Sequence, residues 1–225
     1  MTMPFYVPPE QLMKDRADFA RKGIARGRSV VVLRYADGVC FVAENASATL
    51  HKVSELYDRI GFAAVGRFNE FEALRIAGIQ QADVRGFTYD RADVTARTLV
   101  NSYAQVMGAV FASADKPFEV ELVVAEVAAA PEDDRIYRIS YDGSVFDERS
   151  FAAVGGPSDA VAARLESGFD PAAPLADAVR LAAGALAAAS GADGVPLEVA
   201  VLERTRQARR TFVRLDAARV AELLG

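Results

Sequence analysis

Few residues in this 225-residue chain have the type and spacing that catalysis or ligand binding requires. His51 is the single histidine, so a histidine-dependent triad or a multi-histidine metal site would have to use that residue alone. Lys52 follows it and opens an apolar stretch, and a lysine ammonium can activate a nucleophile or hold an anion. Lys52 is therefore the first candidate for chemistry, with an exposed strand-end lysine as the plainer interpretation and His51 as a bystander.

The other candidate constellations favour structural interpretations. Gly155-Gly156 joins an expected strand to an expected helix, and without a G-x-G-x-x-G or G-x-x-x-x-G-K-[ST] motif it indicates a tight turn. Two carboxylate pairs lack the apolar surroundings that would raise a pKa for acid catalysis, so we expect them on the solvated surface: Glu119 with Glu121, and Asp133 with Asp134. A basic cluster between the last strands indicates a solvated loop or an intersubunit contact, and it comprises Arg204, Arg206, Arg209 and Arg210.

The composition is that of a globular, acidic protein. Hydrophobic residues make up 52% and charged residues 25%, and the net charge of −5 argues against a general affinity for nucleic acid or an anionic membrane. Cys40 is the single cysteine, so no disulfide forms within the chain, and its apolar surroundings predict a core residue. No run approaches the roughly 18 apolar residues of a membrane span, and the N-terminus lacks a signal layout. We therefore expect a cytoplasmic protein.

Two expected β-hairpins position Lys52. Apolar runs at 29–35 and 39–43 flank Ala36-Asp37-Gly38, and Asp-Gly supplies the positive φ of a tight turn. Residues 52–56 and 60–65 form the second strand pair around Tyr57-Asp58-Arg59. Ahead of the first hairpin, Pro8-Pro9 leads into an amphipathic helix over 10–22. This helix packs either on its own domain or against another subunit.

Further elements follow the hairpins. Helices are expected at 69–81, where the small Gly78 allows close packing, and at 91–114, where a buried stripe comprises Leu99, Tyr103, Val106 and Val110. Strands are expected at 118–127, 135–141, 151–154, 197–202 and 210–215. The remaining helices are expected at 159–166 with Ser158 as N-cap, around 175–186, and after Asp216 as the cap of a final helix.

Blocks of strands that alternate with pairs of helices are not a βαβ pattern. They predict an α+β fold in which two mostly antiparallel sheets are stacked between helix pairs, a four-layer αββα sandwich with an extra N-terminal helix. No break divides the chain, so we expect a single domain over residues 1–225.

Three segments resemble proteasome core-particle subunits: GRSVVVLRYADGVCFVAEN, HKVSELYDRIGFAAVGRFNEFEAL and YDGSVFDERSFAAVGG. The N-terminal PPEQLMKDRADFARKGIARGRSVVV is similar to the α type of this family, specifically the actinobacterial α subunit. The resemblance runs from about Pro8 to Leu215 and implies the sandwich of the N-terminal-nucleophile hydrolases. It divides the chain into a tail (1–7), an α-ring helix (8–27) and the sandwich (28–225).

The resemblance implies that the chain is not itself an enzyme. It places Arg28 where catalytic β subunits carry their N-terminal threonine, Glu44 at the family's aspartate and Lys52 at its lysine. Arginine stays protonated in proteins and cannot attack a carbonyl. One alternative is an N-terminal-nucleophile amidohydrolase that processes itself to expose Ser29. Another is a stand-alone regulatory sandwich domain that binds a small ligand.

The family's α subunits form seven-membered rings that stack on β rings, control the passage of protein substrates through a pore and dock activators such as a ring-shaped ATPase. By resemblance, Lys52 pairs with the C-terminal carboxylate of that activator in a pocket between subunits. Gly27 lies beside this pocket, and Asp18 is on the helix that contacts the activator's penultimate aromatic residue. The helices at 8–24 and 69–81 are the candidates for subunit contacts. No cofactor or metal is implied.

The N-terminal tail is the expected gate of the pore. Archaeal and eukaryotic α subunits carry a Tyr-Asp-Arg triplet near the N-terminus, which this tail lacks, and the internal Tyr57-Asp58-Arg59 is not assigned that role. The tail could close the pore by a different arrangement. It comprises Met1, Thr2, Met3, Pro4, Phe5, Tyr6 and Val7.

Overall fold

The computed structural model describes residues 8–191 and 194–225, so the expected gate at Met1–Val7 lies outside the described residues. Two five-stranded sheets form the centre, and every pair of neighbouring strands is antiparallel. The first sheet has the order β10-β9-β2-β1-β8, from Phe212–Arg214, Leu197–Glu203, Gly38–Glu44, Val30–Tyr35 and Phe151–Val154. The second has the order β3-β4-β5-β6-β7, from Val53–Tyr57, Ile60–Gly66, Val120–Glu126, Arg135–Ile139 and Val145–Glu148.

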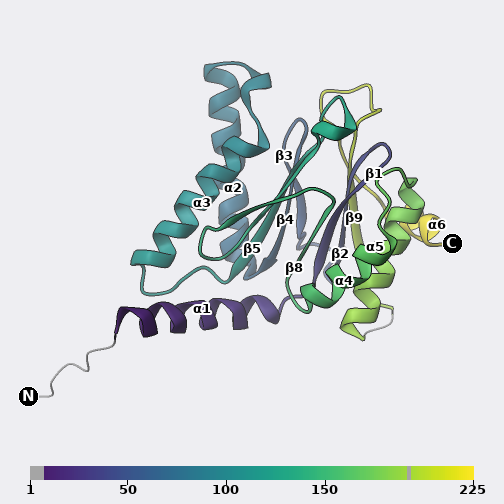
Figure 1. Ribbon diagram of the computed structural model, residues 1–225. Helices are drawn as coiled ribbons and strands as arrows, with labels where there is room; N and C mark the ends of the chain where they lie inside the picture. Colours follow the sequence, from purple (N-terminus) through teal and green to yellow (C-terminus); the bar gives the residue numbers. More distant parts are fainter. Residues whose placement is uncertain (1–7, 192–193) are drawn as a thin grey trace, which may run out of the picture.

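Helices cover the outer face of each sheet (Figure 1). The second sheet is covered by α2 (Phe68–Thr88) and α3 (Ala96–Ser113), and the first by α4 (Ser158–Gly168), α5 (Leu175–Ser190) and α6 (Ala217–Leu224). One apolar cluster lies between the sheets, and one lies between each sheet and its helices. The predicted four-layer αββα sandwich with two antiparallel sheets is therefore confirmed.

The first predicted hairpin is confirmed as β1 and β2, with Tyr35 opposite Gly38. Gly38 has φ +151°, and a Cβ there would lie 2.0 Å from the Leu202 carbonyl oxygen on β9, so only glycine fits this turn. The second hairpin is confirmed as β3 and β4. Cys40 is fully buried on β2, as predicted.

The extra helix α1 (Pro9–Ala25) lies across one end of the sandwich, while the turn between α2 and α3 reaches the opposite end (Figure 1). Its C-terminal half packs on its own chain, because Ala20 and Ile24 are buried against Tyr141. Other large apolar side chains of the helix stay exposed, namely Leu12, Met13 and Phe19. The helix therefore contacts its own domain and keeps further apolar side chains uncovered.

The predicted helix over 91–114 was wrong at its start. Residues Arg91–Asp93 form a short 3-10 helix, and α3 begins only after Thr95, whose side chain accepts the Thr98 N–H at 3.3 Å. The buried stripe continues from Tyr103 to Met107, whereas Val106 is 48% exposed. The helix predicted at 69–81 is the longer α2, which runs to Thr88.

Of the two predicted N-caps, the one of α4 was wrong and the one of α6 is confirmed. Ser158 is the first residue of α4 rather than its N-cap, Pro157 holds the N-cap position, and no side-chain cap bond forms there. Asp216 caps α6 as predicted, because its carboxylate accepts the Arg219 N–H at 2.8 Å.

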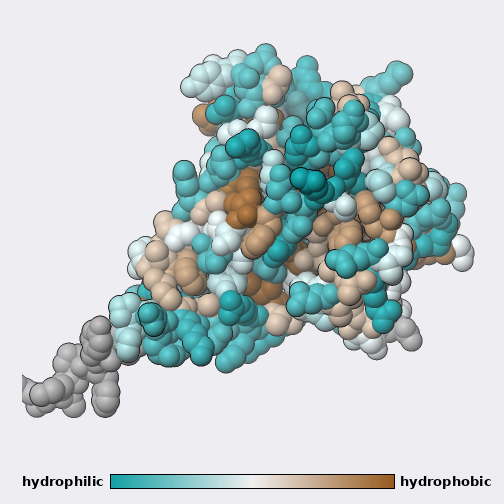
Figure 2. Space-filling view, in the orientation of Figure 1, coloured by the Kyte–Doolittle hydropathy of each residue, from teal (hydrophilic) through white to brown (hydrophobic). Residues whose placement is uncertain are grey.

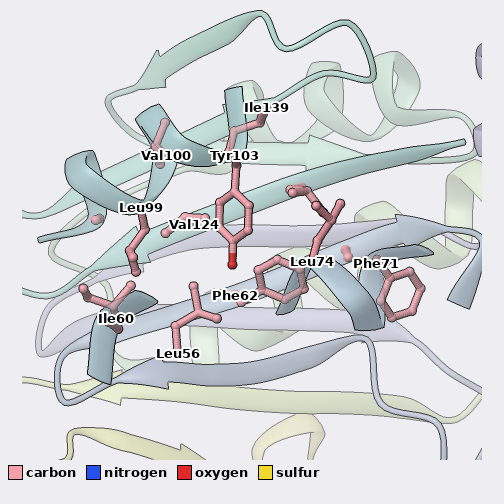
Figure 3. Close-up of a cluster of buried hydrophobic side chains, with 14 of the residues drawn as sticks. Leu56, Ile60, Phe62, Phe71, Leu74, Leu99, Val100, Tyr103, Val124 and Ile139 are labelled. Carbon is pink, nitrogen blue, oxygen red and sulfur yellow. The ribbon is translucent and has the colours of Figure 1, made fainter. Parts of the chain in front are cut away.

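Gly78 brings α2 against α3, as predicted. A Cβ at Gly78 would lie 1.8 Å from the Tyr103 hydroxyl oxygen, so a larger residue would force the helices apart. The ring of Tyr103 extends from α3 toward Phe62 and Leu56 (Figure 3). Its buried hydroxyl has no hydrogen-bond partner among the described residues.

Within residues 8–191 and 194–225, no helix has the length and apolar character needed to cross a lipid bilayer. The same residues contain no cluster of three or more His, Cys, Asp or Glu side chains placed to hold a metal ion.

Candidate functional site

Lys52 lies at the end of the loop that joins β2 to β3, next to the link between α1 and β1. Its ammonium donates a hydrogen bond of 2.7 Å to the carbonyl oxygen of Arg28, the residue between α1 and β1. Burial lowers the pKa of Lys52 to about 8, and the Arg28 guanidinium acts in the same direction. The carboxylates of Glu44 and Glu198 oppose this effect. A partly buried ammonium at this junction can bind an anion.

The residues that the resemblance aligns with catalytic positions of the β subunits make other contacts in this chain. Arg28 lies inside a continuous chain, and its guanidinium is 3.6 Å from the Glu44 carboxylate. Glu44 is 2% exposed and accepts the Ser190 hydroxyl at 2.7 Å, so it serves as a buried structural acceptor. Ser29 is buried on the inner side of the junction, and its hydroxyl donates to the Gly155 carbonyl at 2.9 Å. Lys52 therefore contacts the Arg28 carbonyl, while the Ser29 hydroxyl is committed elsewhere.

The structure brings Gly27 and Lys52 to the same junction, because Gly27 precedes Arg28. A Cβ at Gly27 would lie 2.4 Å from the Val65 side chain, so glycine lets α1 pass close over β4 at this point. Asp18 lies seven residues before the end of α1 at Ala25, about 10 Å along the helix axis. Its carboxylate pairs with Arg21 at 3.4 Å, and no contact with Lys52 is present among the described residues.

Glu198 on β9 is a residue of this site that sequence reasoning missed. Its Oε2 accepts the backbone N–H of Lys52 at 2.9 Å and the Asn45 amide at 2.8 Å. Its Oε1 accepts the Val53 N–H at 3.3 Å, pairs with Arg214 and lies 3.2 Å from His51 Nδ1. His51 therefore contributes to this network rather than standing aside. The available signal was a lone carboxylate within the apolar run 197–202.

The prediction that the paired carboxylates are solvated was wrong for most of them. Glu119 is only 8% exposed, and its carboxylate forms ion pairs with the Lys116 ammonium at 3.0 Å and the Arg67 guanidinium at 3.2 Å. Burial raises the pKa of Glu121. The Gly155 N–H donates a hydrogen bond of 3.3 Å to this carboxylate and acts in the opposite direction. Both groups lie under α1 and the loops beside it, which the strand pattern did not show.

Asp134 was also expected at the surface but is 6% exposed, whereas its neighbour Asp133 is exposed. Its partner is Arg204, whose guanidinium donates to Asp134 at 2.7 Å and is itself mostly buried. The solvated-loop interpretation of the arginine cluster was therefore wrong for Arg204. Arg210 in the same cluster is exposed and pairs with Glu55.

The junction around Lys52 is rich in exposed positive charge. Arg21 and Lys22 lie near the end of α1, and Arg26 and Arg28 lie on the link to β1. Part of this charge is neutralised within the chain, because Arg21 pairs with Asp18 and Arg28 with Glu44, and the partly buried Lys52 lies near Glu44 and Glu198.

Comparison with known proteins shows the family. A family model described as "Proteasome subunit" matches residues 24–202. A protein of Kineococcus radiotolerans named "Proteasome subunit alpha" is 60% identical over 234 residues, which cover 100% of this chain and 98% of that protein. Proteins of the same name are 60% identical in Nocardioides sp., covering 100% and 90%, and 57% identical in Acidothermus cellulolyticus, covering 100% and 98%. The chain belongs to the proteasome subunit family, and within it to the α subunits of the actinobacterial type.

Proposed function

We propose that this chain is a non-catalytic subunit of a heptameric proteasome α ring. The ring stacks on a ring of catalytic β subunits, restricts the passage of protein substrates into the chamber and docks a ring-shaped ATPase. The observation that carries the proposal is the hydrogen bond between the Lys52 ammonium and the Arg28 carbonyl. It leaves the family's lysine beside a residue that has neither a hydroxyl nor a chain-terminal amine to activate.

Lys52 is suited to docking because an ammonium carries three N–H donors. Among the described residues, one of them is used by the Arg28 carbonyl, and the others can meet the C-terminal carboxylate of an activator. Gly27 borders this pocket on the α1 side. Asp18 lies farther along α1 and is assigned to the part of the pocket, between neighbouring subunits, that takes the penultimate aromatic residue.

Two exposed apolar surfaces fit the proposed contacts between subunits. On α1, Leu12, Met13 and Phe19 are 43%, 39% and 47% exposed, and we assign them to the neighbouring α subunit. At the far end of α2, Phe87 is 93% exposed and Tyr89 71%, and we assign this tip to the β ring. Apolar residues also gather over the strands between α3 and α4, whereas the visible side of α1 is largely hydrophilic (Figure 2).

Co-expression with the cognate β subunit tests the proposal. Particle size and peptidase activity are measured for each chain alone and for the mixture, and activity that requires both chains is expected. Lys52→Ala should then abolish stimulation by the activator while basal peptide hydrolysis persists. Stimulation retained in Lys52→Ala would refute the docking role, and a stable monomer by light scattering in the presence of the β subunit would refute the ring.

The proposed gate is tested by deleting residues 1–7 in the assembled particle. Peptide hydrolysis should rise, since the tail then no longer restricts the pore, and an unchanged rate would rule this role out. The amidohydrolase alternative requires a new terminus at Ser29, so N-terminal sequencing of the mature chain separates it from the α-ring proposal.

A further inference from the structure

Glu198 lies behind Lys52 and holds the chain on both sides of it. The carboxylate accepts the backbone N–H groups of both Lys52 and Val53, and it fixes the preceding loop through the Asn45 amide. Asn45 also donates to the Leu50 carbonyl at 2.8 Å, which closes the loop that carries Lys52. One buried carboxylate, which is 8% exposed, therefore anchors both ends of the loop that carries Lys52.

We propose that Glu198 is the positioning residue of the docking lysine, which it aims at the Arg28 carbonyl and the pocket beside it. This inference rests on the proposed docking of a C-terminal carboxylate at Lys52. Glu198 itself does not touch the docked carboxylate and acts through the backbone of Lys52 and Val53 and through the His51 side chain.

The need for such a residue follows from the topology. β3 is an edge strand of its sheet, with β4 as its one strand neighbour. The N–H groups of Lys52 and Val53 are instead bound by Glu198 from the other sheet, and Arg214, which pairs with Glu198, donates to the Val53 carbonyl at 2.7 Å. Hydrogen bonds to a charged group are stronger than those between neutral groups, so this pair fixes the start of β3.

Charge gives Glu198 a second effect on Lys52. The groups that face the ammonium are Glu44 from β2, Glu198 from β9 and Arg28 from the link to β1, and His51 lies beside Glu198. Both carboxylates favour the protonated lysine, which is the form that binds an anion. Removal of the Glu198 charge should therefore lower the pH at which docking is lost, an effect that a purely structural contact would not produce.

The experiment uses particles assembled with the cognate β subunit. The probe is a fluorescent, N-acetylated octapeptide with a penultimate phenylalanine and a C-terminal α-carboxylate, and its C-terminal amide is the reference. In Glu198→Gln we expect affinity for the acid to fall about tenfold, as for the loss of hydrogen bonds to a charged group. The high-pH limb of binding should also move to lower pH. Glu203→Gln, at the other end of β9, is the matched control and should leave both quantities unchanged.

Glu198→Asp is the second variant, and it tests the proposal if Glu198→Gln does not assemble. Its shorter side chain keeps the charge but cannot reach both N–H groups, so a weaker affinity with the wild-type pH midpoint is expected. Wild-type affinity in either variant would overturn the positioning role. By contrast, equal binding of acid and amide by the wild type, or full binding by Lys52→Ala, would overturn the docking function itself.

Discussion

Docking at Lys52 should depend on pH in a range where an ordinary lysine does not titrate. Burial lowers the pKa of this ammonium from 10.5 to about 8, and only the protonated form attracts a carboxylate. The protonated fraction is then about 0.9 at pH 7 and about 0.1 at pH 9. Since apparent affinity scales with the binding-competent fraction, it should fall about tenfold between these two pH values.

Fluorescence anisotropy with the acetylated octapeptide acid measures this effect on the assembled particle. The probe is built without Cys, His, Lys or Tyr and with a fluorophore that does not titrate between pH 7 and 9, and its carboxylate ionises near pH 3.5. Lys52→Arg is the matched control, because a guanidinium stays charged across this range. Its affinity should be lower than that of the wild type at pH 7 owing to the larger head group, and flat up to pH 9.

Two results would refute the reasoning. A wild-type affinity that is constant from pH 7 to pH 9 would show that the Lys52 ammonium is not desolvated in the particle. A fall of equal size in Lys52→Arg would place the titrating group elsewhere at the junction.

The remaining predictions concern stability. Tyr103→Phe removes a buried hydroxyl that has no partner among the described residues, so the melting temperature should rise by about 2–4 °C for a gain of ~1 kcal/mol; a fall would show that the hydroxyl is satisfied. Gly78→Ala places a Cβ 1.8 Å from that hydroxyl and should cost about 1–3 kcal/mol in urea unfolding, and the cost should shrink when Tyr103 is also Phe. Asp134→Ala leaves the mostly buried Arg204 without its partner and should cost about 3–5 kcal/mol, whereas a loss under ~1 kcal/mol would show that water replaces the carboxylate.

The central strands could be predicted because their signals are local. Alternating or continuous apolar runs and the Asp-Gly turn define β1 and β2 within fifteen residues, Val30–Glu44, and Gly38 fits because only glycine tolerates the Leu202 carbonyl there. The start of α3 was missed because its signal is weaker. Thr95 caps the helix, but the preceding Arg91–Asp93 has similar helical propensity and forms a separate turn.

The site could be predicted only in part because its supporting contacts join distant segments. Lys52 stood out in the sequence itself, and the family resemblance supplied its role and the position of Arg28, whereas Glu198 reaches Lys52 across 146 residues of sequence. The misjudged carboxylates have the same cause. The residues around Asp134 are typical of an exposed loop, and its burial comes from Arg204, which is 70 residues later in the sequence. The sequence next to either residue therefore does not indicate that its side chain is buried.

The contact between Lys52 and Arg28 also bears on the proposed binding role of this site. In a chain that processed itself before Ser29, the carbonyl of Arg28 would leave with the N-terminal segment, and Lys52 would lose the acceptor that now fixes its ammonium. Here α1 continues into β1 through Gly27, which fits closely over Val65. The Arg28 carbonyl that accepts the Lys52 hydrogen bond therefore stays part of the chain. The same lysine that would support a nucleophile in a catalytic relative is thereby kept as a positioned cation. The continuity of the chain from α1 to β1 therefore supports the proposed binding role.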